Sequence, residues 1–217
     1  MKNEEPTGYV INRARLPARY PTHAHDPAFW EALGRAVATF GFLEEMLLRA
    51  IFALTVTTPY DESEMELAYA AWASRMTHSL SETLRPLIKN YEKAIREHPD
   101  IREGLDDLLS DLRDACKIRN AICHGSWRVP DSMGRSIPFY VNWQGEVFNT
   151  PVDRAFLETL QKATADLACA VINTVTEMGW QFPGSAGPGR MVWRKGGGAV
   201  GSAPDNSSKP TPLRGAA

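Results

Sequence analysis

A long helical spacing of apolar residues constrains this chain more than any other feature of its sequence. Between residues 27 and 57, apolar side chains recur every three or four positions, at Trp30, Leu33, Val37, Phe40, Leu47, Ile51 and Leu54. This is the period of one face of an amphipathic α-helix. Asp26 followed by Pro27 marks the helix start, because aspartate caps a helix N-terminus and proline fits the first helical position. The helix is expected to end within residues 55–59, and its apolar face requires other helices as packing partners.

Three further segments show the same period. One runs over 61–97, with Pro86 expected to kink or divide it. The next opens at Pro99-Asp100 and runs to residue 124, and the last extends from Thr150, read as its cap, to about Gly179.

Between the third and last of these helices, residues 137–148 read as a short β-hairpin around Gln144-Gly145. The predicted fold is therefore mainly all-α, an antiparallel up-and-down helical bundle interrupted by one short hairpin.

The 217 residues allow one domain with tails. Residues 1–26 contain scattered prolines and no apolar period, and are expected to be an N-terminal arm. Residues 27–181 form the predicted helical domain. Residues 182–217 are basic and rich in Gly, Pro and Ser, so a disordered tail is expected there.

Composition excludes some classes of function. A formal charge of -2 argues against nucleic-acid binding through the overall field and leaves room only for a local basic patch. The three cysteines lack CxxC or zinc-like Cys/His spacing and are expected to be buried thiols. No stretch approaches the ~18 consecutive apolar residues of a membrane span. A soluble cytoplasmic protein with no membrane partner, metal or cofactor is expected.

Two charged residues occupy apolar helix faces. The apolar series 105, 108, 112, 115, 119, 122 places Arg119 where a leucine would be expected, and Glu44 lies between Phe40 and Leu47 in the first helix. A charge on an apolar face costs desolvation energy unless it finds a partner. We therefore expect Glu44 and Arg119 to form an ion pair between the two helices.

Asn120 and His124 lie one helical turn apart, so the amide is expected to hydrogen-bond and orient the imidazole. Gly125 follows as a residue suited to ending the helix. An oriented imidazole with an arginine in reach suits phosphodiester chemistry: histidine serves as general acid or base, and arginine stabilises charge on the phosphoryl oxygens. RNA supplies its own 2′-hydroxyl as nucleophile. The alternative is a purely structural role, in which His124 is a helix cap and Arg119 is a structural ion-pair partner.

The series Arg119-Asn120-x-x-x-His124-Gly125 at a helix end resembles the Arg-polar-x-x-x-His motif of HEPN domains. The resemblance extends to the sequence from Phe40 to Glu44 and covers roughly residues 27–180. It implies a helical bundle that dimerises so that both motifs face one cleft. Many HEPN proteins are metal-independent ribonucleases of toxin–antitoxin or phage-defence systems that leave a 2′,3′-cyclic phosphate.

Carried over to this chain, the resemblance implies that Arg119 and His124 are catalytic, with Asn120 assisting. Members paired with a nucleotidyltransferase antitoxin carry a tyrosine two residues after the histidine, where this chain has Ser126. Regulation through that tyrosine is therefore not expected. Other members of the family are non-catalytic nucleotide-binding or dimerising modules, which is the alternative function.

Overall fold

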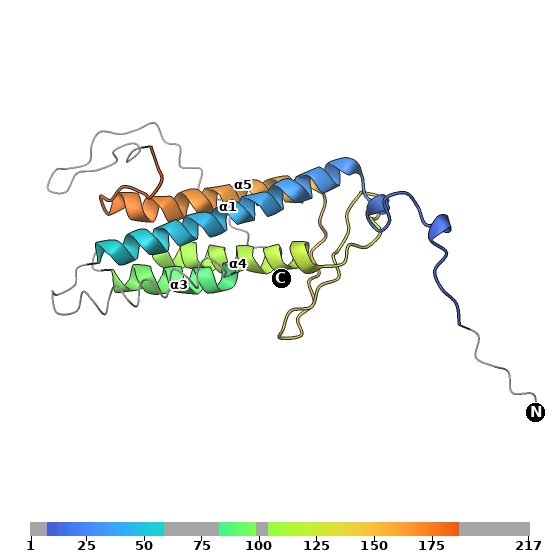
Figure 1. Ribbon diagram of the computed structural model, residues 1–217, viewed down its shortest axis with the longest axis horizontal. Helices are drawn as coiled ribbons and strands as arrows, with labels where there is room; N and C mark the ends of the chain where they lie inside the picture. Colours follow the sequence, from blue (N-terminus) through green and yellow to red (C-terminus); the bar gives the residue numbers. More distant parts are fainter. Residues whose placement is uncertain (1–7, 59–82, 99–103, 187–217) are drawn as a thin grey trace, which may run out of the picture.

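The computed structural model describes residues 8–58, 83–98 and 104–186, and within these ranges the chain is helical (Figure 1). The α-helices within these ranges are α1 (Pro27–Thr57), α3 (Leu84–Glu97), α4 (Leu105–His124) and α5 (Arg154–Glu177). Two single 3-10 turns, Arg13–Arg15 and Thr22–Ala24, precede them. The predicted all-α bundle is thus confirmed.

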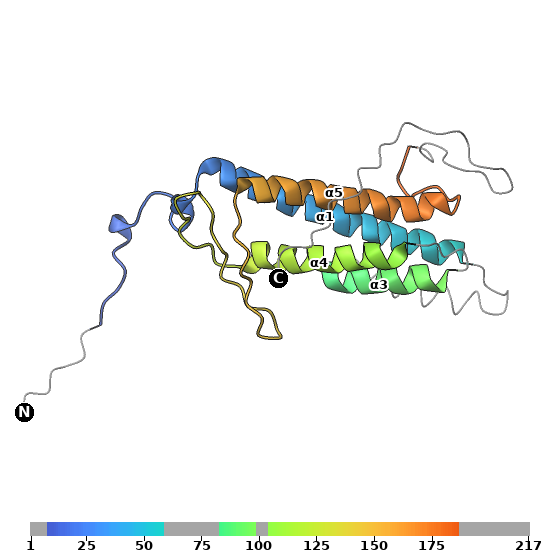
Figure 2. The same ribbon diagram turned by 180° about the vertical axis from the view of Figure 1, so that it is seen from behind.

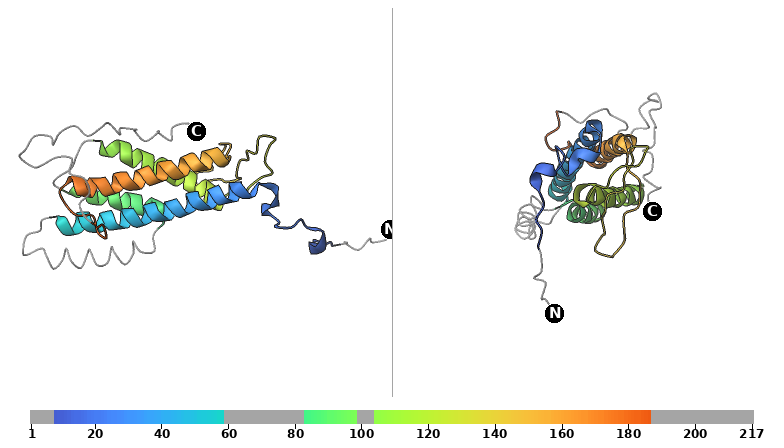
Figure 3. Two further views of the ribbon diagram at one scale, coloured as in Figure 1. Left: turned by 90° about the horizontal axis from the view of Figure 1, so that it is seen from above. Right: turned by 90° about the vertical axis from the view of Figure 1, so that its right-hand side faces the viewer.

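The four helices pack as two layers. Viewed from the end, α1 and α5 lie together on one side, and α3 and α4 lie together on the other (Figure 3). Both side views show α4 running in the opposite direction to the neighbouring helices α3 and α5 (Figures 1 and 2). The N-terminal ends of α1 and α5 and the C-terminal end of α4 consequently lie toward the same end of the bundle.

Helix α1 makes its most extensive contacts with α5 in its own layer, and it contacts α3 and α4 of the other layer. Phe40, Leu43 and Leu47 of α1 are buried, as are Leu157 and Leu160 of α5. Each such side chain contributes about 1.5–3 kcal/mol by leaving water.

One residue of the predicted apolar face of α1 is not buried. Val37 is 39% exposed, because Ala36 turns inward in its place.

The predicted start of α1 is confirmed. Asp26 Oδ1 accepts a 2.7 Å hydrogen bond from the amide of Ala28, and Pro27 is the first helical residue. Pro86 lies in the first turn of α3, where its missing N–H removes no intrahelical bond. The remainder of the predicted 61–97 segment, and the predicted Pro99-Asp100 start, lie outside the described residues; α4 begins at Leu105.

The predicted start of the last helix at Thr150-Pro151 is wrong. Asp153 is the N-cap of α5, and its Oδ1 accepts a 2.7 Å hydrogen bond from the amide of Phe156. Val152, which lies between the predicted start and Asp153, is buried and pairs with Ser136 through two backbone hydrogen bonds of 2.9 and 3.0 Å. This pairing holds the chain extended until Asp153.

The predicted hairpin does not form regular strands among the described residues of the 125–153 segment. Pairing there consists of isolated antiparallel bridges between Ser126 and Phe139, Ser136 and Val152, and Val141 and Val147. A turn at 142–146 is nevertheless well defined, because Asn142 Oδ1 accepts from the amides of both Gln144 and Glu146.

Both predicted domain boundaries fall inside packed structure. His25, at the end of the predicted arm, is buried, and Trp30 Nε1 donates to the carbonyl of Thr22 at 2.8 Å. Phe182, the first residue of the predicted tail, is 3% exposed and belongs to the core. Within the described residues, no helix combines the length and the apolar character needed to cross a membrane.

Candidate functional site

The candidate site is built on the last turns of α4, which end at an unusually crowded glycine. A Cβ on Gly125 would stand 2.4 Å from the carbonyl oxygen of Ala121 and 2.7 Å from Cβ of Pro138. Gly125 has φ -72°, so the requirement for glycine is space rather than left-handed backbone. Its amide donates to Ala121 O at 2.9 Å. The close approach fixes the 125–153 segment directly against the end of α4.

Arg119 connects the two helices at this site. Its Nη2 donates to Oε1 of Glu44 on α1 at 3.3 Å, and the two side chains are 19% and 24% exposed. The predicted ion pair therefore forms, at the edge of the core rather than deep inside it. The pair positions the guanidinium group while leaving part of it accessible to solvent.

The other guanidinium nitrogen contacts the remaining two motif residues. Arg119 Nη1 lies 3.3 Å from Asn120 Oδ1 and 3.4 Å from His124 Nε2. Arginine has only donors, so Nε2 of His124 is the acceptor in this contact. The imidazole is exposed to solvent.

Within the described residues, Asn120 does not form the expected hydrogen bond with His124. Asn120 Oδ1 accepts from Arg119 instead, and its Nδ2 faces Cys116 Sγ at 3.9 Å. The reason is that Arg119 curls toward the helix end and takes the position beside the imidazole. Arg119, rather than Asn120, therefore contacts the histidine.

Two cysteines lie close to these residues. Burial raises the pKa of the Cys116 thiol, an effect opposed by the nearby Arg85 and Arg119. Burial also raises the pKa of Cys123, again opposed by Arg119. Both thiols are therefore protonated near neutral pH and unsuited to act as thiolate nucleophiles. The prediction of three buried thiols holds only for Cys116, because Cys123 is half-buried and Cys169 is exposed.

Comparison of the chain with protein-family models, with curated proteins and with solved structures finds no match.

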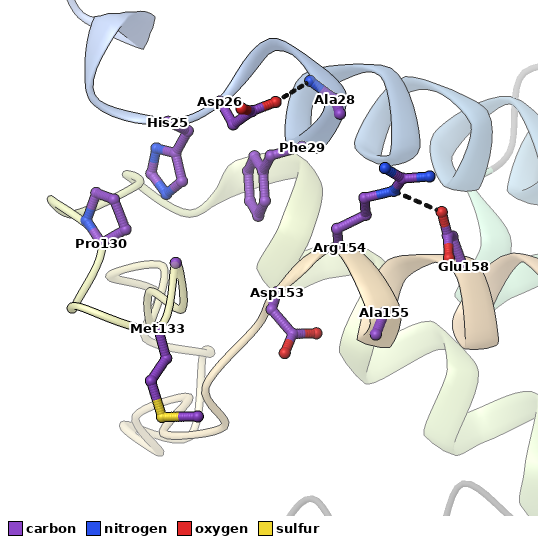
Figure 4. A pocket seen from close by; sticks show the side chains of 11 residues that line it. His25, Asp26, Ala28, Phe29, Pro130, Met133, Asp153, Arg154, Ala155 and Glu158 are labelled. Atoms are coloured by element: carbon purple, nitrogen blue, oxygen red, sulfur yellow. Dashed lines mark hydrogen bonds and ion pairs between the residues drawn. The ribbon is translucent and has the colours of Figure 1, made fainter.

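A cavity of about 450 Å³ at the same end of the bundle is not predicted by any pattern in the sequence (Figure 4). It lies between the N-termini of α1 and α5 and residues 130–134, and neither Glu44 nor the motif residues line it. His25 forms part of its wall, with Nε2 2.8 Å from Ser136 Oγ and the ring stacked on Phe29 at 4.3 Å. Burial lowers the pKa of His25, which favours a neutral ring. The helix caps Asp26 and Asp153 both line this cavity. Each can be recognised as a cap from the sequence, but no sequence pattern near either one indicates that the two lie close together.

The motif residues thus form an open surface site rather than a pocket. Glu44, Arg119 and His124 are joined in a continuous chain of contacts, and Asn120 supports the guanidinium from the side. No group of three or more His, Cys, Asp or Glu residues in the described ranges is arranged to hold a metal ion. What the site offers is a fixed cation and an exposed base beside it.

Proposed function

We propose that this protein is a metal-independent endoribonuclease in which Arg119 and His124 carry the reaction. The observation that supports the proposal best is the 3.4 Å contact between the guanidinium and the exposed imidazole, with Glu44 anchoring the guanidinium from α1. A general base and a fixed cation placed together are what cleavage of an RNA phosphodiester requires.

In the proposed reaction, Arg119 Nη1 moves from Nε2 of His124 to a phosphoryl oxygen, and Nε2 then takes the proton of the RNA 2′-hydroxyl. The 2′-oxygen attacks the adjacent phosphorus and displaces the 5′-oxygen, which leaves as a hydroxyl after protonation by solvent. The products are a 2′,3′-cyclic phosphate and a 5′-hydroxyl end. Arg119 stabilises the charge that develops on the phosphoryl oxygens. Because guanidinium has five N–H donors, it can remain bonded to Glu44 while binding the phosphate.

The test is incubation of the purified full chain with labelled single-stranded RNA in EDTA. We expect cleavage by the wild type and a loss of roughly 10²–10⁴-fold in rate for His124→Ala, the usual range for removing a general acid–base group. Gln161→Ala, a change at a partly exposed position of α5, provides the control. Equal cleavage by wild type and His124→Ala would reject the proposal and indicate a contaminating nuclease.

The proposal includes a cellular setting inferred from the resemblance to HEPN domains. The protein would act as a homodimer with both motifs facing one cleft, as a toxin or phage-defence component, with an antitoxin as a possible partner. A small antitoxin gene beside this one would support the toxin role.

A second candidate function is a non-catalytic nucleotide-binding or dimerisation module. The half-buried Glu44–Arg119 pair favours it, since such a pair also serves to join two helices. In that case Arg119→Ala should chiefly lower stability, by about 1–3 kcal/mol for a lost charged hydrogen bond. Measuring melting temperature and RNA cleavage on the same preparation separates the two functions, because unchanged stability with lost cleavage contradicts the structural role.

A further inference from the structure

The segment after α4 carries an exposed apolar face beside the candidate site. Along residues 137–143, side chains alternate between two sides, as they do in extended chain. Ser136 and Pro138 point toward the bundle and are buried, whereas Phe139 and Trp143 are 54% and 77% exposed. We refer to the exposed side chains of Ile137, Phe139, Val141, Trp143 and Val147 as the 137–147 face. Figure 1 shows this segment, in yellow, projecting from the bundle next to the end of α4.

Backbone pairing fixes this face relative to His124. Ser126 and Phe139 exchange two backbone hydrogen bonds of 2.8 and 3.0 Å, which places the Phe139 residue opposite a residue only two positions after His124. Pro138 packs against Gly125, and the paired turn at 142–146 holds Trp143 at the far end. The face is therefore a preformed extension of the candidate site.

Arg128 gives the face a charge. Its guanidinium carbon lies 4.9 Å from the centroid of the Phe139 ring, within the range of a cation–π contact. Among the described residues, no carboxylate forms an ion pair with Arg128. An exposed aromatic ring with an available guanidinium beside it provides both parts of a nucleotide contact: a surface on which a base can stack and a cation for the phosphate.

We propose that the 137–147 face binds unpaired bases of a single-stranded RNA, with Phe139 and Trp143 as stacking residues and Arg128 as the phosphate contact. This inference rests on the proposed function and names its substrate class. Bases in a duplex are already stacked and cannot be presented to the rings, so single strands are selected. Phe139 and Trp143 are four positions apart, a separation of at most about 13 Å, with Trp143 at the start of the turn, so they contact different nucleotides of one strand.

The experiment uses full-length His124→Ala protein, which keeps the RNA intact, and follows the anisotropy of a fluorescein-labelled oligouridylate in EDTA. Phe139→Ala and Trp143→Ala in this background should each weaken binding by roughly tenfold, the size expected for one lost base stack. Trp180→Ala removes an equally large aromatic residue, 44% exposed just beyond α5, and should leave binding unchanged. Arg128→Ala should weaken binding and reduce its salt dependence. The same oligonucleotide annealed to its complement should bind more weakly than the single strand.

Different outcomes separate this inference from the proposed function. If the parent protein binds RNA and neither Phe139→Ala nor Trp143→Ala weakens it, the stacking role is wrong while the ribonuclease proposal stands. If both variants weaken binding but wild-type protein cleaves nothing, the face is an RNA-binding surface and the ribonuclease proposal is wrong. A shift from dimer to monomer in either variant on size-exclusion chromatography would make the face a protein interface and overturn the inference. Failure of the parent to bind RNA would overturn it as well.

Discussion

At the scale of single residues, the contacts of Arg119 divide its role into two parts. Its Nη2 holds Glu44 and so joins α4 to α1, while its Nη1 contacts Asn120 and His124. The pair with Glu44 is partly exposed, so its contribution to stability lies between that of a surface pair and that of a buried one. The same geometry leaves guanidinium donors facing solvent, where a phosphate can reach them.

A residue-scale prediction concerns the buried His25. Burial lowers the pKa of this imidazole in the folded state below its unfolded value of about 6.5. Above pH 6.5 both states are neutral and the fold has its full stability. As the pH falls below 6.5 the unfolded state gains a proton before the folded state does, so stability decreases. We expect the melting temperature to fall between pH 7.5 and pH 5.5, and to fall less in His25→Asn.

The comparison between His25→Asn and wild type removes the contributions of other titrating groups. His23, exposed and close in sequence, offers a matched control, since His23→Asn should keep the wild-type pH dependence. An identical pH dependence in all three proteins would show that His25 does not resist protonation.

At the scale of elements, the sequence predicted helices well where the determinants are local. The Asp26-Pro27 start and the position of Arg119 on an apolar stripe both follow from neighbours within one or two turns. The start of α5 was misplaced because Thr150 and Asp153 are both good caps, and the choice between them depends on the pairing of Val152 with Ser136, sixteen residues away. The cluster of His25, Phe29 and Trp127 was missed for the same reason, since it joins segments about a hundred residues apart.

An element-scale prediction tests how α4 ends. Gly125→Ala introduces a Cβ into the space occupied by Ala121 O and Pro138, so we expect a loss of about 1–3 kcal/mol in the free energy of unfolding, typical of overpacking. Gly34→Ala is the matched control: it lies within α1 with open space around its Cβ, and should stabilise by about 0.5–1 kcal/mol. Urea denaturation of both variants gives the values. A neutral Gly125→Ala would mean that the 125–153 segment is not fixed against the helix end.

At the scale of the whole molecule, α1 contributes both to the hydrophobic core and to the candidate site. One face of α1 supplies Phe40, Leu43 and Leu47 to the core. The same helix places Glu44 at the edge of the core, where it pairs with Arg119 of α4. The arrangement of helices therefore determines the geometry of the site, and the site adds one ion pair to the packing. The sequence allowed this juxtaposition to be predicted because two unpartnered charges on apolar faces have few ways to be satisfied in one bundle.

The last prediction concerns how the site is distributed in the proposed homodimer. Arg119 and His124 meet within one chain, so each subunit carries a complete set of motif residues. Mixing Arg119→Ala subunits with His124→Ala subunits should therefore restore no RNA cleavage, because every subunit in a mixed dimer lacks one of the two groups. Mixing wild type with His124→Ala, with one subunit mass-tagged, must first demonstrate that subunits exchange. Restored cleavage in the first mixture would mean that the working site takes its arginine from one subunit and its histidine from the other.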